Sequence, residues 1–101
     1  MCKPKAGKLT TNARRHRINL LKKSQGMNCC YCDVEMIEVP RVDGVTPPKT
    51  SLTLEHLKRI EDGGTHAMDN LALACFECNY YRGNIDWFTY KSYRQGELWA
   101  A

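Results

Sequence analysis

Residues 53–84 read TLEHLKRIEDGGTHAMDNLALACFECNYYRGN, and this stretch decides the architecture that we expect. Several distinctive residues lie close together in this stretch: Glu55-His56, Gly63-Gly64, Asn70 and the run Cys75-x-x-Cys78-Asn79. A second C-x-x-C pair lies upstream, at residues 29–32. The cysteine pairs suit a zinc ion, whereas the acid, the histidine and the amides suit a base and a harder metal ion. The sequence therefore predicts two metal sites of different chemistry.

The length of 101 residues predicts one domain with a limited core. Something should supplement that core, and the six cysteines are the obvious candidates, at positions 2, 29, 30, 32, 75 and 78. The N-terminus shows no signal-peptide pattern, and no run approaches the roughly 20 apolar residues of a membrane span. We therefore expect a cytoplasmic protein without membrane contact, whose cysteines bind metal rather than form disulfides.

Two C-x-x-C turns can complete the tetrahedral shell of a structural zinc ion. The predicted ligands are Cys29, Cys32, Cys75 and Cys78, and 42 residues separate the two pairs. Cys30 competes with Cys29, but the spacing of Cys29 to Cys32 is the preferred one. Cys2 is predicted to be a free thiol. With four protein ligands, this zinc ion would have no open position for catalysis.

Hydrophobic periodicity and turn residues predict an α+β fold. We expect a helix from Thr11 or Asn12 to about residue 25, and an antiparallel hairpin between short strands at residues 36–39 and 51–54. Asp69 or Asn70 is predicted to cap a helix that runs through residue 76. A last helix is expected at about residues 86–95, with an aromatic stripe that packs in the core rather than stacking on bases. The divisions are 1–26, 27–84 and 85–101: a basic arm and helix, a metal-binding core, and an aromatic C-terminal helix with its tail.

Positive charge is concentrated at the N-terminus. Of the fifteen Lys and Arg residues, eight precede Asp33, which is the first of the eleven acidic residues. This asymmetry favours a polyanion such as nucleic acid, although the segment could also be only a solvated tail. The candidate phosphate contacts on the predicted helix are Arg14, Arg15, Arg17, Lys22 and Lys23.

The second half of the pattern contains what phosphodiester hydrolysis requires. A neutral imidazole can deprotonate water near neutral pH, which makes His56 the candidate base. Glu55 and Asn79 offer oxygen ligands for Mg²⁺ or Mn²⁺. Because strand neighbours point to opposite faces, a bend or the end of the strand must bring Glu55 and His56 to one site. Asn70 is predicted to organise the loop that follows His56. His66 either shapes the turn at Gly63-Gly64, which we favour, or approaches the site.

These residues together resemble the HNH endonucleases, the ββα-metal nucleases, in their zinc-containing form. The similarity covers about residues 27–84 and rests on an acid-His pair, Gly-Gly, Asn-Leu and C-x-x-C-N followed by a basic residue and glycine. The resemblance implies that His56 is the general base, that Glu55 and Asn79 hold the catalytic metal, and that Asn70 fixes the loop. It also implies that Arg82 contacts phosphate. Glu55 stands where the family usually has aspartate, so its carboxylate would lie about one bond further out.

The resemblance implies a metal-dependent endonuclease with a ββα core, a structural zinc site of four cysteines and flanking helices. The expected substrate is double-stranded DNA, cut to leave 5′-phosphate and 3′-hydroxyl ends. One active site would nick one strand, so a double-strand break needs a dimer or two nicks. The small size suggests a stand-alone nuclease of the phage type, alone or in a larger phage or host assembly. The alternatives are a zinc-stabilised DNA-binding module without catalysis and a protein whose basic arm binds an acidic partner.

Overall fold

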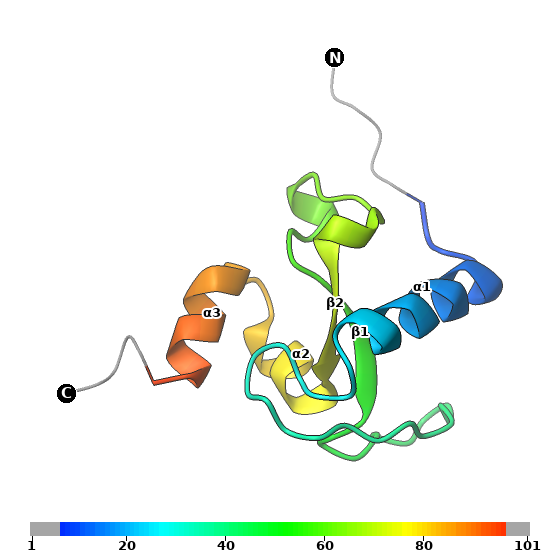
Figure 1. Ribbon diagram of the computed structural model, residues 1–101, viewed down its shortest axis with the longest axis horizontal. Helices are drawn as coiled ribbons and strands as arrows, with labels where there is room; N and C mark the ends of the chain where they lie inside the picture. Colours follow the sequence, from blue (N-terminus) through cyan, green and yellow to red (C-terminus); the bar gives the residue numbers. More distant parts are fainter. Residues whose placement is uncertain (1–6, 97–101) are drawn as a thin grey trace.

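The computed structural model describes residues 7–96, which form a small α+β fold (Figure 1). They contain three α-helices, a two-stranded antiparallel sheet and two short 3-10 turns. In chain order these are α1 (Thr11–Ser24), β1 (Leu52–His56), η1 (Ile60–Asp62), η2 (Met68–Asn70), β2 (Leu71–Cys75), α2 (Phe76–Arg82) and α3 (Trp87–Arg94). The predicted α+β class is thus confirmed. No helix in this part of the chain is long and apolar enough to cross a membrane.

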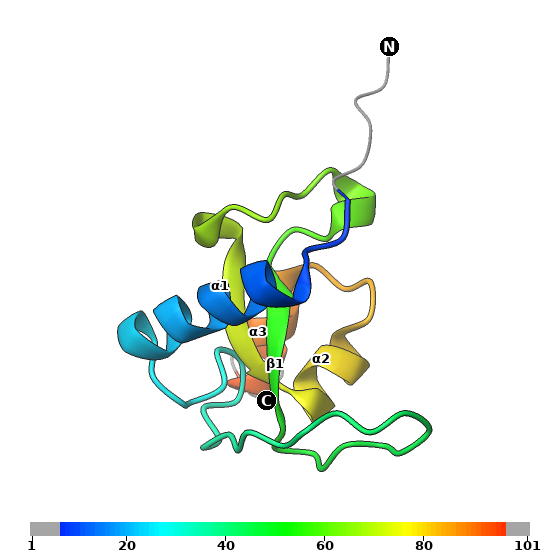
Figure 2. The same ribbon diagram turned by 90° about the vertical axis from the view of Figure 1, so that its right-hand side faces the viewer.

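Helix α1 covers one face of the sheet, while α2 and α3 lie on the other side. Figure 2 shows α1 crossing in front of the strands, with α3 behind them. Helix α1 begins after Thr10, whose hydroxyl accepts a hydrogen bond from the backbone N–H of Ala13 (3.1 Å). The N-cap therefore precedes Thr11 and Asn12, the two residues predicted for it. Ile18 and Leu21 form its buried face. The helix ends before Gln25, close to the predicted position.

The sheet pairs β1 with β2, and two predicted elements are therefore wrong. Residues 71–75 form a strand, not part of a helix that begins at Asp69 or Asn70. All five are buried, so the run LALAC is apolar on both faces, and its pairing with β1 decides the strand state. Helix α2 begins only at Phe76. Consistent with a hairpin, Leu54 lies opposite Leu73 in the register.

The predicted strand at residues 36–39 does not form a hairpin with residues 51–54. Ile37 makes a single parallel bridge with Ser51, and the chain then leaves the sheet. Pro40 follows shortly and has no backbone N–H to continue the ladder. The free edge of β2 is instead covered by the side chain of Gln25, which donates to the carbonyl of Leu73 (2.8 Å) and accepts from its N–H (2.9 Å). This side chain satisfies an edge that would otherwise be open.

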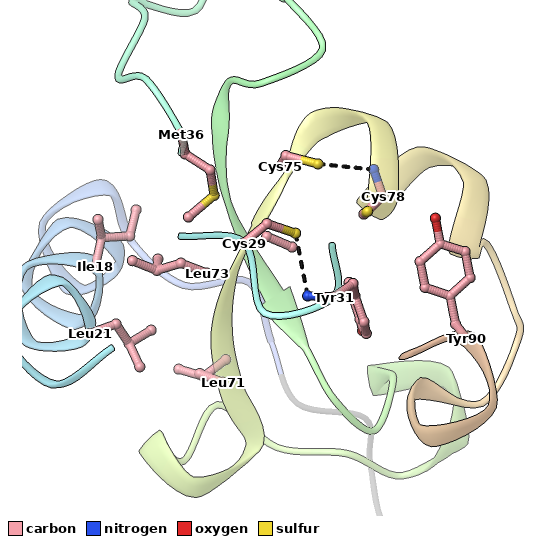
Figure 3. Packing of buried hydrophobic residues seen from close by; sticks show 11 residues of the cluster. Ile18, Leu21, Cys29, Tyr31, Met36, Leu71, Leu73, Cys75, Cys78 and Tyr90 are labelled. Atoms are coloured by element: carbon pink, nitrogen blue, oxygen red, sulfur yellow. Dashed lines mark hydrogen bonds between the residues drawn. The ribbon is translucent and has the colours of Figure 1, made fainter. Parts of the chain in front are cut away.

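Apolar side chains pack against both faces of the strands (Figure 3). On the α1 side, Leu71 and Leu73 lie toward Ile18 and Leu21. Leu73 is completely buried, so the docking of α1 removes the centre of β2 from water. This packing places the basic helix beside the hairpin.

On the other side of the sheet, α2 contacts both strands and α3 covers the first cysteine turn. Helix α3 corresponds to the predicted C-terminal helix. Asp86 caps its start, and the buried ring of Tyr90 meets Tyr31 edge-on, with ring centroids 5.0 Å apart. The predicted core packing thus holds for buried Tyr90 and for half-buried Trp87, which packs against the core, whereas Tyr93 is 52% exposed.

A tight turn of two glycines closes the loop between β1 and β2. Gly63 has a φ of +91°, and its N–H donates to the carbonyl of Ile60 (3.0 Å). Gly64 has an ordinary φ, but a Cβ there would lie 1.9 Å from the carbonyl oxygen of Lys58. Only glycine therefore fits at residue 64 without a backbone shift.

We predict that Gly64→Ala lowers the melting temperature by roughly 10 °C or more, because the backbone must move to relieve the contact. Gly7→Ala is the matched control, since a Cβ at Gly7 would meet nothing within 4 Å. Thermal unfolding of the two zinc-loaded variants makes the comparison. Equal melting temperatures would mean that the loop accepts a side chain at residue 64.

Candidate functional site

The four predicted zinc ligands converge on one point beside the start of α2. Their Sγ atoms all lie within 4.8 Å of one another, and those of Cys32 and Cys75 are 3.8 Å apart. Four sulfur atoms at about 2.3 Å from a zinc ion in a tetrahedron would be about 3.8 Å apart. The cluster has the size and the donor set of a structural zinc site. Its members are Cys29, Cys32, Cys75 and Cys78.

Local hydrogen bonds prepare these sulfur atoms for a cation (Figure 3). The N–H of Tyr31 donates to Sγ of Cys29 (3.4 Å), and that of Cys78 donates to Sγ of Cys75 (3.4 Å). Hydrogen bonds from Cys30 and Cys78 lower the pKa of the Cys29 thiol, whereas burial raises the pKa of Cys75 to about 11. One thiolate is thus favoured, but four together would require a divalent cation to balance their charge.

Cys30 lies outside this group of four. Its backbone N–H donates to the carbonyl of Leu73 (3.0 Å), which ties the first cysteine turn to β2. The geometry therefore selects Cys29 over Cys30 as the partner of Cys32. Cys2 lies outside the described residues.

His56 ends β1, and its imidazole contacts the loop between the strands. Its Nε2 is 2.9 Å from Nδ1 of His66. Burial, with a smaller contribution from His66, lowers the pKa of His56, so the ring is neutral and able to accept a proton near neutral pH. Both rings line a hollow of about 350 Å³, together with Lys8, Arg14 and Glu61. A base and two cationic groups therefore share one opening.

Glu55 points away from this opening, toward α2. It is 7% exposed, and its Oε1 is 3.4 Å from Nη1 of Arg82. The hydroxyl of Tyr31 donates to Oε2 (3.3 Å). Burial raises the pKa of Glu55, while the charge of Arg82 lowers it. The side chains of Glu55 and His56 therefore do not meet at one site, and Glu55 is not an exposed metal ligand in this conformation.

Arg82 is also internal, contrary to the expected phosphate contact. Its side chain is 3% exposed, and its guanidinium donates to the carbonyls of Ile85 (2.7 Å), His56 (2.7 Å) and Leu57 (2.6 Å). It also donates to the hydroxyl of Tyr31 (3.1 Å). The residue thus ties α2 to the end of β1, beside the backbone of the candidate base.

Asn79 is held on the same side of β1 as Glu55. Its Nδ2 donates to the hydroxyl of Thr53 (3.1 Å), and its Oδ1 has no hydrogen-bond partner within residues 7–96. Asn79 lines a hollow of about 620 Å³, which Arg14 and Leu54 also line. These two residues line the hollow beside the candidate base as well. The base and the Asn79 amide therefore open onto neighbouring hollows.

Asn70 spans the loop that follows the candidate base. Its Oδ1 accepts from the N–H of Lys58 (2.8 Å). Its Nδ2 donates to the carbonyls of Lys58 (2.9 Å) and Thr65 (2.8 Å). Three hydrogen bonds from one amide join the two sides of the loop, so the position of Asn70 suits an organising role rather than contact with a substrate.

The basic residues of α1 differ in their freedom to bind phosphate. Lys22 pairs with Glu38, and Nε of Arg17 donates to the carbonyl of His66 (3.0 Å). Three other basic side chains are exposed and form no hydrogen bond or ion pair with the described part of the chain. They belong to Arg14, Arg15 and Lys23.

Two contacts at the site were not predicted in detail. For His66 the sequence favoured a role in the turn and kept approach to the site as the alternative, and in the structure its ring meets the candidate base. Tyr31 was only the residue between two cysteines, but its hydroxyl bridges Glu55 and Arg82. Neither contact has a spacing signal, because each depends on how the chain folds back in three dimensions. The adjacency of His66 to the glycine turn was the only available sign.

The HNH endonuclease family matches residues 29–84 of the chain, which is more than half of its length. The matched segment includes both cysteine pairs, the acid-His pair, Asn70 and Asn79. A comparison with curated proteins finds no match.

We predict that Cys75→Ser loses the zinc ion and most of the folded population, because a structural zinc site contributes about 10–16 kcal/mol. Cys30→Ser is the matched control, and it should keep one zinc ion per chain and a normal melting curve. Elemental analysis and circular dichroism measure both. Full zinc content and a normal melting curve in Cys75→Ser would contradict the assignment.

We also predict that Arg82→Lys destabilises the fold by about 3 kcal/mol, because an ammonium cannot replace the planar guanidinium and leaves Glu55 poorly paired. Urea unfolding at constant zinc content measures the loss. Arg59→Lys, at a surface arginine bonded to Asp62, should leave stability near that of the wild type. If both changes had the same small effect, the internal role of Arg82 would be wrong.

Proposed function

The chain belongs to the HNH endonuclease family, and from this premise we propose that it hydrolyses phosphodiester bonds in double-stranded DNA. The observation that carries the proposal is the half-buried imidazole of His56 at an opening that Lys8 and Arg14 also line. Hydrolysis needs a base for water and positive charge for the phosphate at one place. This opening offers both.

In the proposed reaction, His56 removes a proton from the attacking water. Its lowered pKa supports this role, because the ring stays neutral and accepting where a surface histidine would begin to protonate. Arg82 and the antiparallel pairing with Leu71 fix the backbone of His56, which supports a constant position for the ring. The base would therefore need little rearrangement on substrate binding.

Positive charge around the opening would bind the DNA backbone. Arg14 and Lys8 line the hollow of the base, and exposed Arg15 and Lys23 extend the charge along α1. Such phosphate contacts position a duplex without reading its sequence. We propose that the lysines and arginines of the basic segment 1–26 act as this positioning element for the nuclease core at residues 27–84, with residues 85–101 as the C-terminal helix and tail.

HNH nucleases use a divalent metal ion, and we propose Mg²⁺ or Mn²⁺ for this chain. When bound, the ion would neutralise charge on the phosphate and stabilise the leaving oxygen. The amide oxygen of Asn79 has no partner in the described chain, but Glu55 is engaged by Arg82 and Tyr31, so the assigned ligands do not form a finished site in this arrangement. The zinc ion cannot substitute, since four cysteines fill its tetrahedron.

The burial of Glu55 also favours a second candidate function. If the ion pair with Arg82 is permanent, the chain would be a zinc-stabilised DNA-binding module without hydrolysis. Both candidates predict salt-sensitive DNA binding, and only the first predicts cleavage. Cleavage of both strands would require two copies or two nicks, and membership of a phage or host assembly stays a prediction.

We predict that zinc-loaded wild type nicks supercoiled plasmid when Mg²⁺ or Mn²⁺ is added, and that His56→Ala loses about 10²-fold or more of the rate. His16→Ala, at an exposed histidine of α1, is the control and should nick at the wild-type rate. DNA affinity and its salt dependence are measured in parallel and should be unchanged in His56→Ala.

Three outcomes separate the possibilities. Equal nicking by wild type and His56→Ala would remove His56 as the base. Salt-sensitive binding without nicking in either metal would favour the binding module. A DNA affinity that does not fall as the salt concentration rises would argue against a nucleic acid partner.

A further inference from the structure

We propose that His66 is a positioning residue for His56: it holds the ring so that the lone pair of Nδ1 is presented to water. The observation is the imidazole pair between the end of β1 and the loop, with Nε2 of His56 2.9 Å from Nδ1 of His66. The inference rests on the function proposed above, in which His56 is the base.

The direction of the hydrogen bonds follows from the far end of the pair. Nε2 of His66 lies within hydrogen-bond distance of the carbonyl oxygen of Gly7, and a carbonyl only accepts. Nε2 of His66 therefore carries a proton, and in a neutral ring Nδ1 then has the lone pair. That lone pair accepts from Nε2–H of His56. The neutral ring of His56 consequently has its own lone pair on Nδ1.

Nothing in the described chain occupies that lone pair. Nδ1 of His56 has no hydrogen-bond partner within residues 7–96, and the ring lines the hollow of about 350 Å³ that Arg14 and Lys8 also line. A general base needs this arrangement: one nitrogen fixed by a partner and the other free to accept the proton of water.

His66 is itself held from three directions. Arg17 of α1 donates to the backbone carbonyl of His66 (3.0 Å), and the ring of His66 donates through Nε2–H to the carbonyl of Gly7. Asn70 donates to the carbonyl of the preceding residue, Thr65 (2.8 Å). A partner restrained in this way can restrain the ring that it contacts. A residue that only shaped the turn would require no ring contact with His56.

The first test measures the hydrogen bond without any substrate. In ¹⁵N-labelled, zinc-loaded protein, NMR should show a scalar coupling across the hydrogen bond between Nε2 of His56 and Nδ1 of His66. The ¹⁵N shifts should place a proton on Nε2 of both rings in the neutral state. Absence of the coupling, or a proton on Nδ1 of His66, would overturn the proposal.

The second test uses a pair of variants at residue 66. His66→Gln keeps an acceptor, its amide oxygen, and should retain most of the nicking rate and a solvent-protected Nε2 proton on His56. His66→Leu keeps bulk but has no acceptor, and should lose that protection and about 10-fold or more of the rate, at unchanged DNA affinity. His16→Leu is the control for replacing an exposed histidine by leucine.

The outcomes distinguish this inference from the proposed function. If His66→Gln and His66→Leu nick equally, with equal zinc content and melting temperature, His66 does not position the base. If His66→Leu fails to fold, the nicking rate of His66→Gln and the coupling in the wild type decide whether His66 positions the base. If wild type does not nick but the coupling is present, the pairing of the rings stands and the nuclease proposal fails.

Discussion

The cluster of four cysteine sulfur atoms brings together two turns of the chain, at residues 29–32 and 75–78, which the small sheet alone would hold only weakly. The cysteine pairs are separated by 42 residues, and an isolated two-stranded sheet is marginally stable in water. A zinc ion in this cluster would close that interval and contribute about 10–16 kcal/mol. The first cysteine turn includes Tyr31, and the second leads into the helix with Asn79 and Arg82. The positions of these three residues therefore depend on the metal centre.

The alternation of β1 then divides the hairpin into a side that packs against α2 and a side that carries the candidate base. Thr53 and Glu55 contact α2, whereas His56 contacts the loop on the other side. Arg82 links the two sides, because its guanidinium both faces the carboxylate of Glu55 and bonds the carbonyl of His56. Buried Arg82 thus fixes the backbone of the candidate base, and Glu55, the residue before that base, supplies the negative charge that balances the arginine. Removing the carboxylate ligand from this pair to bind a metal ion would leave the arginine uncompensated.

Short motifs in the sequence predicted several parts of the fold. Cysteine spacing identified the four clustered thiols, Asp86 marked the start of α3, and the Gly63-Gly64 pair marked the tight turn. The strand at residues 71–75 was missed because five consecutive apolar residues satisfy both helical and strand periods, and only pairing with β1 separates them. The inward turn of Arg82 and the ring contact of His66 were equally hidden, since each depends on segments that meet only in three dimensions.

The N-terminal segment illustrates why such contacts matter for function. Its contribution could be read from sequence as charge alone, but the carbonyl of Gly7 and the guanidinium of Arg17 both bond His66. The docking of α1 through Ile18 and Leu21 therefore brings positive charge and a contact to His66 to the same opening. Arg14 faces that opening, while Arg15 and Lys23 are exposed without an ion pair to residues 7–96. If the chain binds DNA as we propose, charge removal at Arg15 or Lys23 would act on DNA affinity alone, whereas a change at Arg17 would reach the candidate base through His66.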